Sequence, residues 1–117
     1  MTDIHPQPLR ILVVDDDESV RGSIAYHLDR LGHQVIEASS AAWALELFER
    51  HRPHMVLSDI VMPEHDGYWL AKGIRQREAQ LGGWTPIIFL SSLSEATSVA
   101  DGIAAGGDDY LTKPVHP

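Results

Sequence analysis

Short apolar runs alternate along the chain with segments of helical periodicity. The apolar runs are typical of strands buried in a parallel sheet, which read as continuous rather than alternating apolar stretches. They comprise Leu9–Val14, Gln34–Ala38, His54–Ser58, Pro86–Leu90 and, more weakly, Asp109–Thr112. Apolar residues recur at helical spacing in the segments between them, Ser19–Leu31, Ser40–Arg50, Gly67–Leu81 and Ser94–Ala105. This order predicts an α/β fold, a doubly wound five-stranded parallel sheet with four helices on its two faces.

The predicted helices have recognisable ends. Ser40 is a residue type that caps helix amino termini, and Pro53 stops the pattern of the second helix. Gly32, Gly82 and Gly106 follow the other three helices, where a glycine tolerates the left-handed exit. The helix boundaries therefore agree with the alternation of strands and helices.

Length and composition restrict the choice of function. The 117 residues suffice for one domain, predicted over 9–117 after a disordered lead-in at 1–8. Nine Lys and Arg against 17 Asp and Glu give a net charge of −8, which disfavours direct nucleic-acid binding. Disulfides and thiolate metal sites are excluded because the chain has no cysteine. No apolar run approaches the length of a membrane span, so we expect a soluble, cytoplasmic protein without a membrane partner.

Polar and charged residues stand where the predicted strands end. Asp15 and Asp16 follow the first strand, Asp59 the third, Ser91 the fourth and Lys113 the fifth. The carboxyl ends of the strands meet at one edge of such a sheet, where ligands bind. Crowded carboxylates repel one another, and the repulsion is relieved either by a raised pKa or by a hard divalent cation. We therefore predict a Mg²⁺ site at this edge.

Phosphoryl transfer to an aspartate uses this combination of groups. Asp59 is the predicted nucleophile, and Asp15 and Asp16 are the predicted metal ligands. Lys113 and Ser91 would supply a cation and a hydroxyl donor to phosphoryl oxygens. Each residue alone has an ordinary structural explanation, such as a helix first turn for the acidic run, a solvated lysine or a strand-end cap, so the hypothesis depends on their joint occurrence.

Four ordered motifs carry a family resemblance. They are ILVVDDD at Ile11–Asp17, SDIVMP at Ser58–Pro63, Leu90–Ser91, and GGDDYLTKP at Gly106–Pro114. Together they resemble the receiver domain of two-component response regulators. The resemblance implies a flavodoxin-like sheet of strand order 2-1-3-4-5, with function at its carboxyl edge.

The resemblance also implies roles for particular residues. Asp59 would accept a phosphoryl group from a sensor histidine kinase or a phosphotransfer protein. Asp16, Asp59 and the backbone carbonyl of Val61 would bind Mg²⁺ directly, and Asp15 would act through a metal-bound water. Ser91 and Lys113 would contact the phosphoryl group, and Tyr110 would be the switch aromatic residue. The Lys113–Pro114 peptide bond would be cis.

The chain departs from the family where it stops. The family continues after the Lys-Pro turn into a fifth helix, whereas this chain stops at Pro117. One interpretation is that the sequence is a fragment of a longer protein. The other is a homodimer formed through the uncovered sheet face, because an exposed apolar patch of that kind recruits a partner.

Three classes of function follow from these residues. The first is a phosphorylatable switch whose modification changes the surface around the fourth helix and fifth strand. The second is an aspartate-nucleophile phosphohydrolase, which Val61 disfavours because no acid stands two residues beyond Asp59. The third is an interaction module independent of phosphorylation, which the complete set of site residues disfavours. We therefore expect no enzyme beyond slow self-dephosphorylation.

Overall fold

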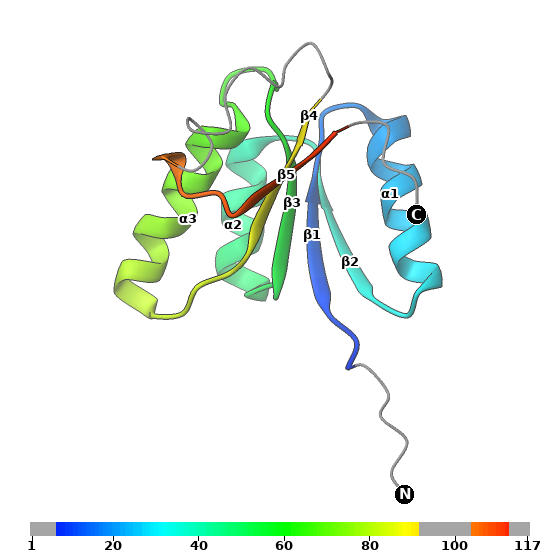
Figure 1. The fold of residues 1–117 in the computed structure, drawn as a ribbon, viewed down its shortest axis with the longest axis horizontal. Helices are drawn as coiled ribbons and strands as arrows, with labels where there is room; N and C mark the ends of the chain where they lie inside the picture. The colour runs from blue at the N-terminus through cyan, green and yellow to red at the C-terminus, as the bar shows by residue number, and fades with distance from the viewer. Residues whose placement is uncertain (1–6, 92–103, 113–117) are drawn as a thin grey trace, which may run out of the picture.

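The computed structural model describes residues 7–91 and 104–112, which form a parallel sheet with helices on both faces (Figure 1). The strands are β1 (Arg10–Val14), β2 (Gln34–Ala38), β3 (Met55–Asp59), β4 (Ile87–Ser91) and β5 (Asp109–Thr112), and the helices are α1 (Glu18–Arg30), α2 (Ala41–His51) and α3 (Gly67–Leu81). The strand order is β2-β1-β3-β4-β5, and all neighbouring strands are parallel. The predicted sheet is therefore confirmed.

Successive residues of β1 belong to two separate cores. Leu12 and Val14 pack with the buried residues of α2 and α3 on one face of the sheet. Ile11 and Val13 pack with Ile24 of α1 on the other face. Figure 1 shows the same division, with α1 on one side of the sheet and α2 and α3 on the other. Because the strand is buried on both faces from Ile11 to Val14, these four residues are continuously apolar.

Side chains cap the amino termini of the helices. Asp17 accepts hydrogen bonds from the backbone N–H groups of Ser19 and Val20, so α1 begins at Glu18, one residue before the predicted start. Ser40 caps α2 as predicted, and its Oγ accepts from the N–H of Trp43 at 3.2 Å. Several described strands begin or end one residue away from the predicted bounds. The periodicity of side chains does not define strand ends to within one residue.

The carboxyl end of α2 was not fully predicted. The helix ends at His51, and Arg52 then adopts a left-handed conformation, with φ of 46°. Its backbone N–H donates to the carbonyl of Phe48, which satisfies one of the last carbonyls of the helix. Pro53 stops the helix as predicted, while the turn itself is made by a non-glycine residue.

Arg75 ties α3 to the amino-terminal ends of β4 and β5. Its guanidinium donates to the carbonyls of Gly106 and Thr85 and pairs with the carboxylates of Glu78 and Asp108. Asp108 also accepts from the N–H of Ile87 at 2.8 Å. Arg75 thus links the end of the sheet opposite the predicted site to the helix that covers it.

Several predictions concern residues outside the described ranges. Of the predicted fourth helix, Ala104 and Ala105 are described and are helical, and Gly106 follows with φ of 107°, as expected at a helix end. Three complete helices are therefore described in residues 7–91 and 104–112. Most of the lead-in, Lys113 and the predicted cis bond to Pro114 lie outside the described residues. Within the described ranges, none of the helices has the length and apolar character of a membrane span.

Candidate functional site

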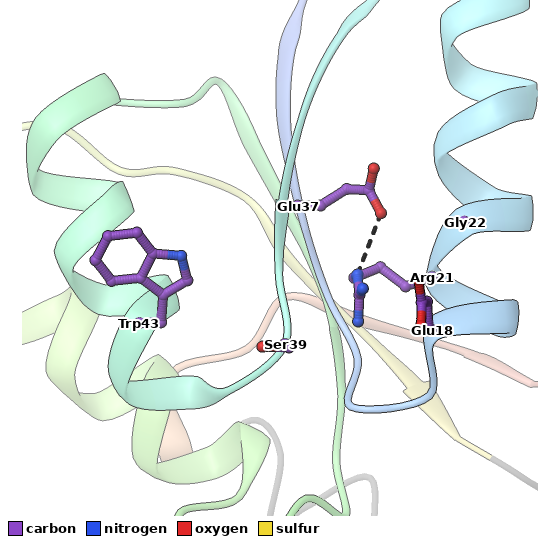
Figure 2. Close-up of a pocket in the computed structure, with 6 residues that line it drawn as sticks. All are labelled: Glu18, Arg21, Gly22, Glu37, Ser39 and Trp43. Carbon is purple, nitrogen blue, oxygen red and sulfur yellow. Dashed lines mark hydrogen bonds and ion pairs between the residues drawn. The ribbon is translucent and has the colours of Figure 1, made fainter.

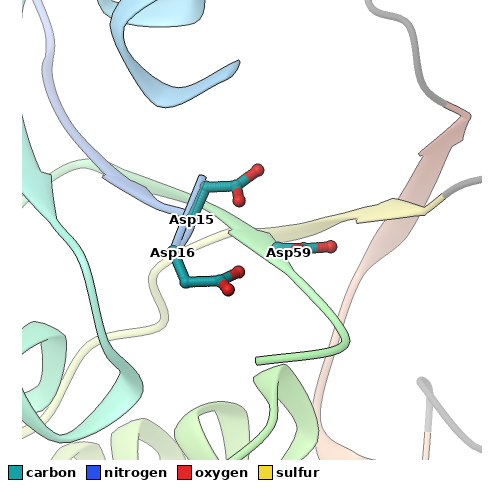
Figure 3. Close-up of side chains that lie close together, drawn as sticks. All are labelled: Asp15, Asp16 and Asp59. Atoms are coloured by element: carbon teal, nitrogen blue, oxygen red, sulfur yellow. The ribbon is translucent and has the colours of Figure 1, made fainter. Parts of the chain in front are cut away.

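Three carboxylates converge at the carboxyl edge of the sheet (Figure 3). Asp15 and Asp16 follow β1, and Asp59 is the last residue of the adjacent strand β3. One carboxylate oxygen from each lies within 4.8 Å of the other two. Asp15 and Asp59 are buried, whereas Asp16 is exposed. The structure therefore brings together the three acidic residues that the sequence placed at strand ends.

The backbone of Asp15 is fixed on both sides. Its N–H donates to the carbonyl of Ala38 at 3.2 Å, which extends the pairing of β1 with β2. Its carbonyl accepts from Nη1 of Arg21 at 2.8 Å. One side-chain oxygen, Oδ1, accepts from the N–H of Asp17 at 3.0 Å, where the chain turns into α1. These contacts orient the first acidic residue of the site.

The loop that begins at Asp59 is equally constrained. Oδ1 of Asp59 accepts from the N–H of Ile60 at 2.9 Å. The carbonyl of Ile60 accepts from the N–H of Gly67 at 2.7 Å, which draws the start of α3 against the end of β3. A Cβ atom on Gly67 would lie 2.3 Å from the carbonyl oxygen of Asp59. Gly67 was not predicted as a site residue. The Asp66-Gly67 pair before a helical segment is the sequence signal of a close turn that could have identified it.

The donor set fits a hard divalent cation. Carboxylate oxygens are the ligands that Mg²⁺ and Ca²⁺ prefer, and three of them gather here from two neighbouring strands. In a largely buried setting such charges repel one another strongly, and a divalent cation offsets that repulsion. Asp15, Asp16 and Asp59 could therefore hold a metal ion.

The other predicted site residues occupy different positions. Ser91 ends β4 next to β3 and is buried, with 1% of its surface exposed. Val61 lies in the loop after Asp59 with its side chain exposed. Lys113 lies outside the described residues, so the structure does not place it.

Tyr110, the predicted switch residue, belongs to an aromatic cluster. Its hydroxyl is hydrogen-bonded to the hydroxyl of Tyr68 on α3. The rings of Tyr68 and Tyr110 both contact Phe89 of β4, with centroid distances of 5.1 and 5.5 Å. Tyr68 was not singled out by the sequence, because nothing in its local pattern distinguishes it from an ordinary packing residue.

Comparison with known proteins defines the family. The family model of the response regulator receiver domain matches residues 11–117. The chain therefore belongs to the receiver domains of response regulators, which are signalling domains of two-component systems.

Individual relatives agree with this assignment. The chain is 36% identical over 111 residues to the probable transcriptional regulator ycf27 of Porphyridium aerugineum, covering 95% of this chain and 44% of that protein. It is 37% identical over 108 residues to the alkaline phosphatase synthesis transcriptional regulatory protein PhoP of Bacillus subtilis (strain 168), covering 92% of this chain and 43% of that protein. The crystal structure of a putative response regulator from Chloroflexus aurantiacus superposes with a TM-score of 0.84 at 32% identity, covering 94% of this chain and 88% of that chain. The chain thus spans less than half the length of these two curated relatives.

Proposed function

We propose that this domain is a phospho-accepting switch in which Asp59 receives a phosphoryl group in the presence of Mg²⁺. The observation that supports this proposal is the gathering of the Asp15, Asp16 and Asp59 carboxylates within 4.8 Å of one another at the end of the sheet. The phosphoryl donor would be the phosphohistidine of a sensor histidine kinase or a phosphotransfer protein. Membership of the receiver domains of response regulators supports this chemistry over other uses of an acidic cluster.

Asp59 is the nucleophile in this proposal. A lone pair of one carboxylate oxygen forms the new O–P bond while the P–N bond of the donor phosphohistidine breaks, and its electron pair returns to the imidazole. The side-chain hydrogen bond from the N–H of Ile60 to Oδ1 holds the Asp59 carboxylate in one orientation. The reacting group is therefore oriented before the donor arrives.

Asp15, Asp16 and Asp59 would hold the Mg²⁺ ion, with the backbone carbonyl of Val61 as a further ligand. When bound, the ion supplies neutralisation of charge on the phosphoryl oxygens. Ser91 and Lys113 would donate hydrogen bonds to the same oxygens, Ser91 from the neighbouring strand end.

The conformational response would involve Ser91 and Tyr110. The register of the sheet places the last residue of β4, Ser91, beside Thr112 of β5, two residues after Tyr110. A movement of the Ser91 hydroxyl towards a phosphoryl group on Asp59 would be felt by β5 and by the ring of Tyr110, changing the surface around the fourth helix and β5. A homodimer is one form that the output could take.

Turnover by the domain itself would be limited to slow self-dephosphorylation. Val61 is apolar and exposed two residues beyond Asp59, a position from which an acid or amide could otherwise orient an attacking water. A phosphohydrolase that turns over small phosphoesters is the less favoured alternative for this reason. Any DNA contact made by a whole regulator would lie outside these 117 residues, whose net charge is −8.

The test is phosphorylation by a small donor. The protein is incubated with acetyl phosphate with and without Mg²⁺, and its intact mass is measured. We expect the addition of one phosphoryl group, dependent on Mg²⁺ and absent from Asp59→Asn. Asp17→Asn is the matched control, because Asp17 caps α1 and an asparagine caps equally well, so this variant should be modified like the wild type.

The outcomes separate the three classes of function. Modification that persists in Asp59→Asn would overturn the assignment of the nucleophile. Absence of any modification in the wild type would favour an interaction module independent of phosphorylation. Rapid and repeated consumption of acetyl phosphate would favour a phosphohydrolase.

A further inference from the structure

Arg21 of α1 connects the acidic site to the edge of the sheet. Its Nη1 donates to the carbonyl of Asp15 at 2.8 Å, and its Nε donates to Oε1 of Glu37 on β2 at 3.1 Å. Figure 2 shows the Arg21 side chain reaching from α1 to Glu37, at a pocket also lined by Trp43. The arginine side chain is largely buried, with 14% of its surface exposed, while Glu37 is 45% exposed.

The contact with Asp15 bears directly on the next residue of the site. The carbonyl of Asp15 and the N–H of Asp16 belong to one planar peptide unit. A hydrogen bond to this carbonyl therefore restricts the orientation of the backbone at Asp16. The N–H of Asp15 is held separately by Ala38. Arg21 therefore fixes the peptide bond between Asp15 and Asp16, two of the three acidic residues of the site. It does so without being one of the residues that would bind the cation.

The charge of Arg21 is engaged away from the site. Within residues 7–91 and 104–112, the carboxylate at ion-pair distance from its guanidinium is that of Glu37. A guanidinium carries a fork of donors, and here one branch is used for the carbonyl and another for Glu37. The pairing with Glu37 holds the guanidinium in the orientation in which it also donates to the carbonyl of Asp15.

We infer that Arg21, oriented by Glu37, is a positioning residue that sets the affinity of the acidic cluster for a divalent cation. The inference rests on the proposed function of that cluster as a metal site. Neither residue touches the reacting atoms, so their effect is on the geometry of Asp15 and Asp16 and not on the chemistry of Asp59.

Positioning and simple electrostatics predict different effects of the Arg21 substitutions on cation affinity. If Arg21 acted only as a nearby positive charge, Arg21→Gln would tighten cation binding and Arg21→Lys would leave it unchanged. If Arg21 acts by positioning, both variants weaken binding, because neither side chain can hold the carbonyl and Glu37 with the same fork. Loss of such an outer contact typically weakens metal affinity by about 10-fold or more.

The test uses Mn²⁺ as the probe, titrated into the full chain while free Mn²⁺ is followed by electron paramagnetic resonance. We expect Arg21→Gln and Arg21→Lys to raise the dissociation constant about 10-fold. Glu37→Gln should raise it by a smaller factor, because the arginine keeps its bond to the carbonyl but loses its charged partner. Tighter binding by Arg21→Gln would overturn the inference.

A matched pair of variants controls for loss of stability. Arg77 and Glu49 form another ion pair, more exposed than that of Arg21, between α3 and α2 and away from the carboxyl edge of the sheet. Arg77→Gln and Glu49→Gln should bind Mn²⁺ like the wild type, and urea unfolding shows whether each variant is folded during the titration. If the wild type binds Mn²⁺ and the Arg21 variants bind it equally well, the positioning role fails alone. If the wild type does not bind Mn²⁺, the proposed metal site fails and this inference fails with it.

Discussion

Gly67 and Asp59 are in backbone contact, and the contact leaves no room for a side chain on Gly67. A Cβ atom there would lie 2.3 Å from the carbonyl oxygen of Asp59 and 3.2 Å from Cα of Ile60. Both obstacles are backbone atoms, so relief requires movement of the loop that starts at the proposed nucleophile. The start of α3 and the end of β3 are thus joined at the site itself.

Gly67→Ala should therefore lower both stability and phosphorylation. We expect a loss of about 1 to 3 kcal/mol in the free energy of unfolding, the usual cost of overpacking. The rate of Asp59 modification by acetyl phosphate should fall as well. Gly22→Ala is the control, since a Cβ on Gly22 of α1 meets nothing within 4 Å and alanine should stabilise the helix by about 0.5 to 1 kcal/mol. Equal stability of Gly67→Ala and wild type in urea unfolding would contradict the predicted clash.

Tyr68→Phe should lower stability and loosen Tyr110. The substitution removes the bond between the two hydroxyls while both rings keep their contacts with Phe89. We expect a loss of about 1 kcal/mol, typical of a single hydrogen bond. A double-mutant cycle with Tyr110→Phe, measured by urea unfolding, should show that the two losses are not additive. Fully additive losses would mean that the hydroxyl bond contributes nothing to stability.

Arg75→Ala should be far more damaging than Arg77→Ala. Arg75 is the partner of Glu78, whose side chain is only 4% exposed, so its removal leaves a buried carboxylate without its cation. We expect a loss of about 3 to 5 kcal/mol, as for broken buried ion pairs. Arg77 pairs with Glu49 on the surface, where a loss of about 1 kcal/mol or less is expected. Thermal or urea unfolding of the two variants distinguishes these outcomes, and similar losses would refute the special role of Arg75.

Mg²⁺ should stabilise the folded domain through the acidic cluster. At a concentration 100 times its dissociation constant, a ligand that binds only the folded state adds about 2.7 kcal/mol. The melting temperature of the wild type should rise accordingly on addition of Mg²⁺ and return after chelation. Asp16→Asn should lose most of this response. Without the cation it should be at least as stable as the wild type, because one of the repelling charges is gone. An unchanged Mg²⁺ response in Asp16→Asn would exclude Asp16 as a ligand.

The sequence was sufficient to predict the sheet and the meeting of Asp15, Asp16 and Asp59. In a parallel sheet the carboxyl ends of all strands share one edge, so a polar residue after a strand is placed by topology alone. The order of the strands came from the resemblance to receiver domains, and the structure confirms it.

The contacts made by Gly67, Arg21 and Arg75 could not be predicted in the same way. Arg21 meets Glu37, and Arg75 meets Asp108, across segments whose relative placement depends on how each helix packs on the sheet. Arg52 is a further example, since a proline marks where a helix must stop but not which preceding residue takes the left-handed turn. Periodicity identifies the face that a residue occupies, whereas these contacts depend on side-chain rotamers and loop paths.

Because successive residues of β1 belong to two different cores, the strand tolerates substitutions better than changes of length. Insertion or deletion of one residue within Arg10–Val14 would exchange the faces of Ile11 and Val13 with those of Leu12 and Val14, pairing each with the wrong helices. The same displacement would also shift Asp15 at the acidic edge, because Asp15 directly follows the strand. Changes of length at this strand would therefore eliminate folding and the proposed phosphoryl acceptance together, whereas substitutions among similar apolar residues would leave both intact.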